Sequence, residues 1–535
     1  MDLLREPVGR GPTLVAIPPG NRHVRRATGA GRRSSFAQVL ARTRTFALHG
    51  VDALPVDVEI DIHRGLPAFS LVGLPDAAVR ESRERVRAAI VNCGFEFPLK
   101  RITANLAPAD LRKAGPGFDL AIAAAILCAS GQIPAAGLAR WCLAGELALD
   151  GSIRSLPGVL AMAERAGSAG GGIAVAEANA GEARLAGETA VAALGSLSDL
   201  AGLARGELPD PPASPPAPVV PAPLPDLSDL RGQPGLREGL EVAAAGGHGV
   251  LVVGPPGAGK SLAARRLPSI LPPLSLGEAI EVTKIASVAG RGPIDGTLAG
   301  RPFRAPHHTI SSAGLVGGGS PPRPGEITLA HRGVLFLDEL GEFARSSLEA
   351  LRQPLEDGSV TISRAQGAMT FPARFQIVAA ANPCPCGHGE DSRSCSCPGE
   401  RARAYKARLS GALADRFDLS LRVEQPSAEA LAGDPGESSA AVAARVLEAR
   451  ARQEARLGPG RTNASMTEAE MAEHVRLDER GSAALAAAHG GMGLSGRGWN
   501  RVLKVARTLA DLAGAERVGE EQIDVALSLR RKIAA

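Results

Sequence analysis

The stretch Val250-Leu-Val-Val-Gly-Pro-Pro-Gly-Ala-Gly-Lys-Ser261 decides how the centre of this chain folds. A short aliphatic run leads directly into a glycine-rich loop, and the helix-favouring Leu262-Ala-Ala-Arg-Arg266 follows. Strand, glycine loop and helix in this order are the context that a P-loop requires. Its glycines let backbone N–H groups turn towards phosphates, and the helix N-terminus adds the positive end of its dipole. The stretch therefore predicts an α/β core that binds ATP.

The residues of this loop have different expected roles. Lys260 is expected to reach the β- and γ-phosphates, and Ser261 is expected to hold Mg²⁺. ATP and Mg²⁺ are thus the predicted cofactors. The predicted nucleotide-binding residues of the loop are Gly254, Pro255, Pro256, Gly257, Ala258, Gly259, Lys260 and Ser261.

A second apolar run, Gly333-Val-Leu-Phe-Leu337, ends in the acidic pair Asp338-Glu339. This is a Walker B pattern, in which Asp338 organises Mg²⁺ and Glu339 polarises the attacking water as a general base. The alternative is a strand that ends in a solvated acidic pair. The P-loop earlier in the chain favours the catalytic interpretation.

A third apolar run, Phe375-Gln-Ile-Val-Ala-Ala-Ala381, ends at Asn382-Pro383. A polar residue at the tip of a strand beside the P-loop is well placed to orient the attacking water. Asn382 is therefore predicted to occupy the position called sensor 1 in AAA+ ATPases. The alternative is that Asn382 caps a turn.

Two arginines are candidates for contacts with the γ-phosphate. Arg416 could act as a finger that crosses into a neighbouring subunit's site, a contribution of roughly 10³–10⁵ in rate. Its alternative role is a salt bridge to Asp415 or Asp418. Arg497 begins a predicted helix and is the candidate sensor 2 residue, with Arg501 one turn later as the other choice. A solvated helix face is the alternative for both.

Four of the seven cysteines lie in two close pairs directly after the third run, at Cys384, Cys386, Cys395 and Cys397. Four thiolates can close a tetrahedral Zn²⁺ site, although the C-x-C spacing is tighter than the common one. His388 is a reserve ligand. Redox-active or unliganded thiols are the alternatives. The three other cysteines, Cys93, Cys128 and Cys142, stand singly in apolar surroundings and are interpreted as small core residues.

Composition limits the classes of partner. The net charge of the 535 residues is +4, and only 3% of them are aromatic. Such a chain is a poor candidate for base stacking, so any nucleic acid should be held through its phosphates. No apolar run approaches the ~20 residues of a membrane helix, and the N-terminus lacks a secretory h-region. A cytoplasmic location without membrane contact is expected, and the odd cysteine count argues against a disulfide framework.

The chain divides into five expected parts. They are a disordered basic tail over 1–35, an α/β domain over 36–206, a Pro-rich linker over 207–226, the ATPase core over 227–430 and a helical region over 431–535. The tail is either dispensable or an arm that touches DNA. Strands are predicted over 56–62 and 102–106, and helices over 76–92, 119–129, 440–456, 482–489, 497–512 and 520–533. Asp76 is the expected N-cap of its helix.

Together these motifs resemble the magnesium-chelatase-like AAA+ ATPases, specifically the YifB/ComM family of bacterial competence proteins. The resemblance covers nearly everything from Thr43 onwards, and its most specific pieces are Gly65–Asp76, Lys100–Asp110, Phe303–His308 and Gly333–Gly358. It implies a homo-oligomeric, hexameric ring with a C-terminal helical lid. It also implies the finger role for Arg416 and the sensor role for Arg497. In this family Phe303–His308 resembles the helix-2 insert, which projects towards the ring pore.

The domain over 36–206 resembles the Lon-protease-like fold. Proteolytic relatives place a nucleophilic Ser in a Gly-Pro-Ser-type turn before a helix, whereas this chain has Gly115-Pro-Gly-Phe118 followed by Asp119. With neither Ser nor Cys there, peptide cleavage has no attacking group. We therefore expect a non-catalytic scaffold or binding module.

By resemblance, the first functional hypothesis is a DNA motor that drives branch migration, with helicase activity on single-stranded or branched DNA, during natural transformation. Arg304, His307 and His308 on the expected pore segment support it. The alternatives are a protein-remodelling ATPase of the chaperone type and the ATPase subunit of a metal chelatase. The extended N-terminal domain counts against the chelatase.

Overall fold

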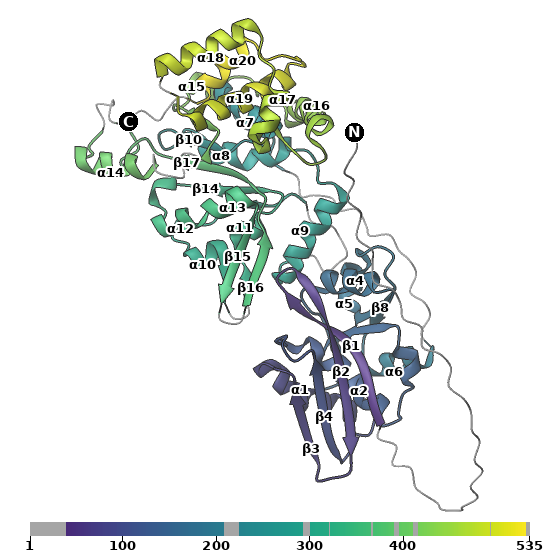
Figure 1. Ribbon diagram of the computed structural model, residues 1–535. Helices are drawn as coiled ribbons and strands as arrows, with labels where there is room; N and C mark the ends of the chain where they lie inside the picture. Colours follow the sequence, from purple (N-terminus) through teal and green to yellow (C-terminus); the bar gives the residue numbers. More distant parts are fainter. Residues whose placement is uncertain are drawn as a thin grey trace, which may run out of the picture. The chain divides into compact units, whose positions relative to one another are not determined.

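The computed structural model describes residues 39–207, 224–292, 300–319, 322–364, 367–389, 395–409, 416–492 and 494–530 (Figure 1). The predicted tail, most of the predicted linker and Asp415 lie outside these residues. No helix within the described ranges combines the length and the apolar character that a membrane span requires. The described chain is mixed α/β, as predicted.

The first domain is built on a seven-stranded mixed sheet with the order β3-β4-β2-β1-β5-β8-β9. Its strands are β1 (Val39–His49), β2 (Asp52–His63), β3 (Ala68–Val72), β4 (Arg101–Ala107), β5 (Trp141–Ala144), β8 (Gly172–Ala176) and β9 (Val191–Leu194). β2 pairs antiparallel with β1 and β4, and the other pairings are parallel. The strands predicted over 56–62 and 102–106 are confirmed within β2 and β4. Buried residues alternate along β2, as the period of a half-buried strand requires.

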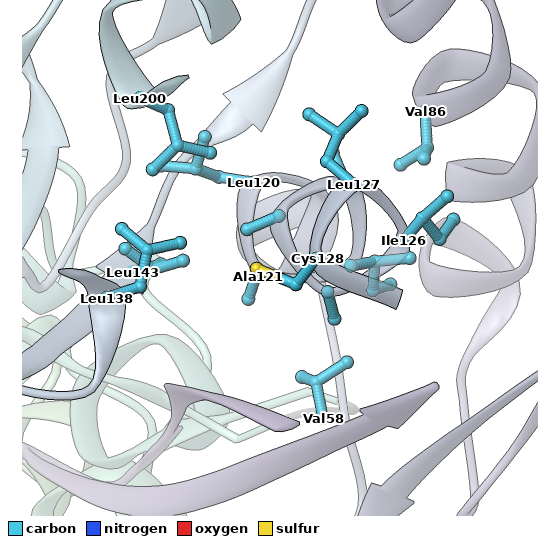
Figure 2. Close-up of a cluster of buried hydrophobic side chains, with 14 of the residues drawn as sticks. Val58, Val86, Leu120, Ala121, Ile126, Leu127, Cys128, Leu138, Leu143 and Leu200 are labelled. Atoms are coloured by element: carbon cyan, nitrogen blue, oxygen red, sulfur yellow. The ribbon is translucent and has the colours of Figure 1, made fainter. Parts of the chain in front are cut away.

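Helices complete this domain. They are α1 (Ala77–Asn92), α2 (Asp119–Ala129), α3 (Ala135–Leu138), α4 (Val159–Ser168), α5 (Glu177–Arg184) and α6 (Leu197–Arg205), with a small hairpin of β6 (Glu146–Leu147) and β7 (Ile153–Arg154). The predicted cap is confirmed, because the Asp76 side chain accepts the Val79 N–H at 2.8 Å. Every residue of α2 is buried, and Figure 2 shows Val58, Val86, Leu143 and Leu200 around it. The helix predicted over 119–129 is therefore the centre of the domain's core.

The expected ATPase core, over 227–430, contains a five-stranded sheet with the order β11-β14-β17-β10-β18. Its strands are β10 (Val250–Val253), β11 (Phe303–Arg304), β14 (Val334–Leu337), β17 (Gln376–Ala381) and β18 (Leu419–Arg422). All four pairings are parallel, so the carboxyl ends of the strands meet at one edge. The three apolar runs found in the sequence thus form three adjacent strands of one sheet.

One sequence interpretation is corrected here. Phe303–His308 was expected to project as an insert, but Phe303 and Arg304 form the edge strand β11 and pair with Val334 and Leu335. The Arg304 guanidinium binds the Glu326 carboxylate with two donors, at 2.6 and 2.8 Å. The Arg304 side chain is thus engaged within its own chain, and a strand of two residues is too short to leave a periodic signal in the sequence.

The remaining elements of the core surround this sheet. They are α7 (Pro234–Gly246), α8 (Lys260–Arg266), α9 (Leu276–Val288), α10 (Ser312–Val316), α11 (Glu326–Leu329), α12 (Arg345–Ala350), α13 (Arg352–Asp357) and α14 (Gly399–Leu409). Two hairpins pair β12 (Gly317–Gly318) with β13 (Arg323–Pro324) and β15 (Ser359–Arg364) with β16 (Gly367–Pro372). Buried side chains of the two faces form separate clusters, so each face of the sheet is covered.

The C-terminal region is helical, as predicted. It contains α15 (Ala428–Ala432), α16 (Ser439–Leu457), α17 (Glu468–His474), α18 (Glu479–Met492), α19 (Gly496–Leu512) and α20 (Glu520–Ser528). Its buried residues share one cluster with α7. The predicted end of the last helix is wrong, because α20 stops at Ser528 and the Leu529 carbonyl accepts the Ser420 N–H of β18.

Candidate nucleotide-binding site

The glycine loop runs from the end of β10 into α8, and the fold explains why its glycines are needed. Gly257 and Gly259 have φ values of +80° and +84°, a region that L side chains rarely adopt. Gly254 has no room for a side chain, because a Cβ there would lie 2.4 Å from the Val423 carbonyl oxygen. Ala258 is buried, and its carbonyl accepts a hydrogen bond from Gln233. These constraints fix the shape of the loop that leads into α8.

Lys260 lies at the start of α8 and points back across the loop. Its ammonium donates to the carbonyl oxygens of Gly254 and Pro255, at 2.6 and 2.8 Å, and to Asn382 Oδ1 at 3.1 Å. Burial lowers the pKa of Lys260 from its ordinary value, and the carboxylates of Asp338 and Glu339 oppose this shift. A phosphate at this place would favour the charged form.

Ser261 and Asp338 come together as predicted. The Ser261 hydroxyl donates to Asp338 Oδ2 at 2.7 Å, and Asp338 Oδ1 accepts the Glu339 N–H at 3.0 Å. Mg²⁺ prefers oxygen ligands and is commonly held by one or two carboxylates together with substrate phosphates. A hydroxyl and a carboxylate oxygen side by side at the end of the P-loop fit this ion.

Glu339 adopts a left-handed backbone conformation at the end of β14, with a φ of +54°. Its Oε2 lies 3.2 Å from His308 Nδ1, and its side chain is 54% exposed. The His308 ring lies 4.1 Å from that of His307 and 6.5 Å from that of Phe343. Nothing in the sequence spacing of His308 and Glu339 indicates that the two residues meet, so this contact was not predicted.

Asn382 follows β17, the strand between β10 and β14, and its side chain reaches Lys260. Tyr405 of α14 lies beneath it: burial raises the pKa of this phenol to about 12, and a hydrogen bond with the Asn382 backbone opposes the shift. The Tyr405 ring also fills the space above Gly341, where a Cβ would approach it to 2.3 Å. Tyr405 is a second residue of the site that the sequence analysis missed.

The two candidate arginines lie away from this group. Arg416 forms an ion pair with Glu356 of α13, which is neither of the carboxylates considered from the sequence. Asp418 contacts His248 and Arg501 instead. Burial lowers the pKa of Arg416, and the nearby positive charges of Arg497, Arg352 and Arg501 add to this effect. Arg497 lies near the start of α19, as predicted, and its side chain is exposed; its sensor 2 role stays a prediction.

The structure gathers Cys384, Cys386, Cys395 and Cys397, whose sulfur atoms all lie within 4.8 Å of one another. The exposed His388 is not part of this group. Of the other three, Cys128 and Cys142 are buried as predicted, whereas Cys93 is only partly buried at the C-terminus of α1.

Comparisons with known proteins identify the family of this chain. The family model described as magnesium chelatase, subunit ChlI, matches residues 226–431. Models of subunit ChlI of Mg-chelatase and of the ChlI C-terminal part match residues 58–179 and 436–530. These matches extend over both domains and the C-terminal helices.

Full-length relatives were also found. YifB of Escherichia coli K12, an uncharacterized protein, is 43% identical over 92% of this chain and 97% of its own length. An uncharacterized protein of Mycobacterium tuberculosis is 44% identical over 92% of this chain and 99% of its own. The competence protein ComM of Haemophilus influenzae is 42% identical over 92% of this chain and 98% of its own. The family suggests an ATPase that uses ATP and Mg²⁺ and is commonly oligomeric. The resemblance drawn from the motifs is confirmed, and the chain belongs to the magnesium-chelatase-like family that includes YifB and ComM.

Proposed function

We propose that this chain hydrolyses ATP between its P-loop and Walker B strand and works as a ring-shaped motor on DNA. One observation carries the first half of this proposal. The ends of three adjacent parallel strands bring Lys260, Asp338 and Asn382 to the same edge of the sheet, with Lys260 bound to Asn382 and Ser261 bound to Asp338. Ligands of open α/β sheets bind at this edge.

Each of these residues has a task in hydrolysis. Lys260 exchanges its present carbonyl acceptors for oxygens of the β- and γ-phosphates, which are better partners for an ammonium. Ser261 and Asp338 hold Mg²⁺, which supplies positive charge against the phosphates. Asn382 orients the attacking water, and Glu339 accepts a proton from it. We propose that His308 holds the Glu339 carboxylate in place through the 3.2 Å contact.

The topology supports a site that is shared between subunits. The Asp418 N–H donates to the Gly249 carbonyl, so Arg416 lies at the amino end of the sheet. Gly254 lies at the opposite end of β10, five residues away, and at about 3.3 Å per residue this is roughly 16 Å. Neither Arg416 nor its neighbour Arg497 is therefore suited to the phosphates of its own chain. We propose that both face the nucleotide of an adjacent subunit, Arg416 as the finger and Arg497 as sensor 2, in a hexamer.

DNA is the proposed substrate because a relative that aligns over nearly its whole length is a competence protein. We propose branch migration or helicase activity on single-stranded or branched DNA in the cytoplasm during natural transformation. Contacts of such a motor with DNA phosphates make its binding weaken as salt rises.

We propose that the first domain has the Lon-protease-like fold and serves as a scaffold or binding module. Its turn Gly115-Pro-Gly-Phe118 offers no nucleophile, and the Phe118 side chain is buried. Asp119, the next residue, is fully buried in an ion pair with Arg85 at 2.7 Å. These features support a closed, non-catalytic interior.

The test is to measure ATP hydrolysis and particle mass with single-stranded, duplex and branched DNA and with no DNA, using Lys260→Ala as the inactive control. We expect the mass of six chains, ATPase stimulation by single-stranded or branched DNA, and ATP-dependent movement of the branch. A ring that never moves branched DNA under ATP contradicts the DNA motor. Stimulation by an unfolded polypeptide but not by DNA indicates a protein-remodelling ATPase instead.

A further inference from the structure

The segment after Asn382 contains a group that ATP hydrolysis does not explain. Four cysteines from two parts of this segment converge, although Cys384 and Cys397 are thirteen positions apart in the chain. None of them forms a disulfide. A loop that merely connects β17 to α14 has no need to bring four thiols together, so a ligand that thiols recognise is the simplest explanation.

The distances between sulfur atoms fit a single tetrahedral ion. Four ligands about 2.3 Å from a Zn²⁺ ion lie about 3.8 Å from one another. Cys384 Sγ lies 3.2 Å from Cys386 Sγ and 3.8 Å from Cys395 Sγ, and the Cys386 and Cys395 sulfurs are 3.7 Å apart. A disulfide requires about 2.0 Å between sulfur atoms. An iron–sulfur cluster, which holds several iron atoms, needs a wider cavity than sulfurs within 4.8 Å enclose.

Backbone N–H groups orient two of the four sulfur atoms. The Cys386 N–H donates to Cys397 Sγ at 3.3 Å, and the Gly389 N–H donates to Cys384 Sγ at 3.2 Å. Hydrogen bonds of this kind orient metal ligands and adjust their basicity. With His388 outside the group, the donor set is four thiolates, which favours zinc among the common divalent metals.

We propose that Cys384, Cys386, Cys395 and Cys397 bind one Zn²⁺ ion in a closed structural site. All four positions around the ion are taken by protein ligands, so no open position remains for a substrate. Each thiol gives up its proton when the ion binds.

The surroundings of the site connect it to the nucleotide. Cys384 is two residues after Asn382, and Cys397 is two residues before α14, which carries Tyr405 to the Asn382 backbone. Gly387 packs so closely on the P-loop that a Cβ there would lie 2.7 Å from Pro256 Cδ. In this proposal, bound zinc therefore holds the segment after β17 close to the N-terminus of α14 and to the P-loop. This positioning role rests on the proposed ATPase, whereas the metal site itself does not.

The metal site is tested by elemental analysis of the full chain purified without a chelator. We expect one zinc per chain in the wild type and in Cys93→Ser, a matched change of a partly buried cysteine outside the group. We expect zinc to be lost from Cys395→Ser. Zinc well below one per chain, or zinc content unaltered in Cys395→Ser, overturns the site. Iron in place of zinc overturns the identity of the metal.

A measurement on the wild type guards against a variant that fails to fold. Titration with an organomercurial, followed by a zinc-sensitive dye, counts the thiols that react for each zinc released. We expect four thiols per zinc. Cobalt exchanged into the same protein should give the intense charge-transfer absorption of a tetrathiolate. Zinc release without thiol modification contradicts cysteine ligation.

The positioning role has its own readout. In Cys395→Ser we expect kcat for ATP hydrolysis to fall about tenfold, as when a group that orients the reacting water is displaced. ATP affinity should change less, because Lys260 and the loop glycines remain. A normal kcat in a zinc-free variant contradicts the positioning role but does not contradict the proposal that the wild type binds zinc. If the zinc-loaded wild type does not hydrolyse ATP, this result contradicts the proposed function and not the metal site.

Discussion

Two helices of this chain begin directly after a turn containing Gly-Pro, and their N-termini are used in opposite ways. Before α2 the turn is Gly115-Pro-Gly-Phe118, and before α8 it is the loop that begins at Gly254. At α2 the chain supplies its own anion, since Asp119 is fully buried and accepts hydrogen bonds from Ser82, Arg85 and the Leu147 N–H. At α8 the first side chains are Lys260 and Ser261.

The difference teaches where an external anion can bind. Backbone N–H groups at a helix N-terminus favour a negative charge whatever its source. In the first domain Asp119 places an internal carboxylate in the first turn of α2, and the guanidinium of Arg85 neutralises it. In the proposed ATPase core Asp338 and Glu339 follow β14, which β17 separates from the P-loop strand β10, and the loop is free to accept phosphates. The same backbone device thus gives a sealed core in one domain and a candidate site in the other.

The largest expected effect concerns the candidate nucleotide-binding site. Glu339→Gln removes the proposed general base while keeping its shape. We expect kcat to fall by about 10²–10⁴, whereas ATP binding persists because Lys260 and Ser261 are unchanged. Single-turnover hydrolysis and equilibrium binding of a fluorescent ATP analogue measure the two effects. Glu342→Gln, an exposed carboxylate three residues later, is the matched control. Equal losses in both variants contradict the role of Glu339.

The next effect concerns the buried Asp119 of the first domain. Arg85→Met leaves the Asp119 carboxylate buried without its partner, and we expect the first domain to lose about 3 kcal/mol of unfolding free energy. The chain has only two tryptophans, Trp141 in β5 and Trp499 in α19. In a Trp499→Phe background, urea unfolding followed by fluorescence therefore reports on the first domain alone.

A double change provides the control for this prediction. Arg85→Met combined with Asp119→Asn removes both charges, and we expect it to recover much of the lost stability, because replacing a whole buried pair costs less than breaking it. A double variant no more stable than Arg85→Met indicates that Arg85 contributes through packing.

A smaller effect concerns the turn itself. Gly115 has a φ of +87° and a ψ of 170°, a region that is essentially restricted to glycine. A Cβ there meets nothing within 4 Å, so the cost of Gly115→Ala is purely conformational, about 2 kcal/mol. Gly65→Ala, where φ is not positive and the nearest atom is 3.4 Å away, should be nearly neutral. Urea unfolding with the Trp141 reporter checks both, and equal stability of the two variants contradicts the argument.

The sequence predicted those parts of the site that lie at the ends of single elements. The P-loop, Asp338 and Asn382 each follow an apolar run, and parallel pairing of three such runs is sufficient to bring them together. Contacts between side chains of separate segments have no such pattern. His308 and Glu339, or Tyr405 and Asn382, meet only because the sheet and α14 bring distant segments together.

The lack of a sequence pattern for contacts between distant segments also explains why the positions of Phe303 and Arg304 and the partner of Arg416 were not predicted. Phe303 and Arg304 were interpreted as part of a projecting segment, but they form the edge strand beside β14. Of the two carboxylates considered for Arg416, Asp415 lies outside the described residues and Asp418 contacts His248 and Arg501. Arg416 pairs with Glu356, sixty positions away in the chain. Amphipathic periodicity requires several residues of one element, so it identified β2 and the C-terminal helices and failed at short strands and single ion pairs. The buried helix α2 was identified by its continuous apolar run instead.

The smallest predicted effect returns to Glu339. Its backbone is left-handed and its side chain is half exposed, so the His308 contact is what restrains the carboxylate. We expect His308→Ala to lower kcat about tenfold, as a modestly misplaced base would, with unchanged ATP affinity. His308→Asn, which keeps a donor, should restore part of the rate, and His307→Ala, which changes the exposed neighbouring ring, should alter it little.

A rise in the ATPase rate of His308→Ala would instead mean that His308 restrains Glu339 from acting, and this would reverse its role. The comparison with Asp119 favours the first outcome. Both carboxylates are oriented by a side chain from another segment: Arg85 binds Asp119 with its guanidinium, and His308 lies beside Glu339 with one ring nitrogen. The guanidinium of Arg85 holds the Asp119 carboxylate inside the buried core, away from solvent. The imidazole of His308 fixes the orientation of the Glu339 carboxylate. It leaves half of the Glu339 side chain exposed to water, so Glu339 is still able to accept a proton.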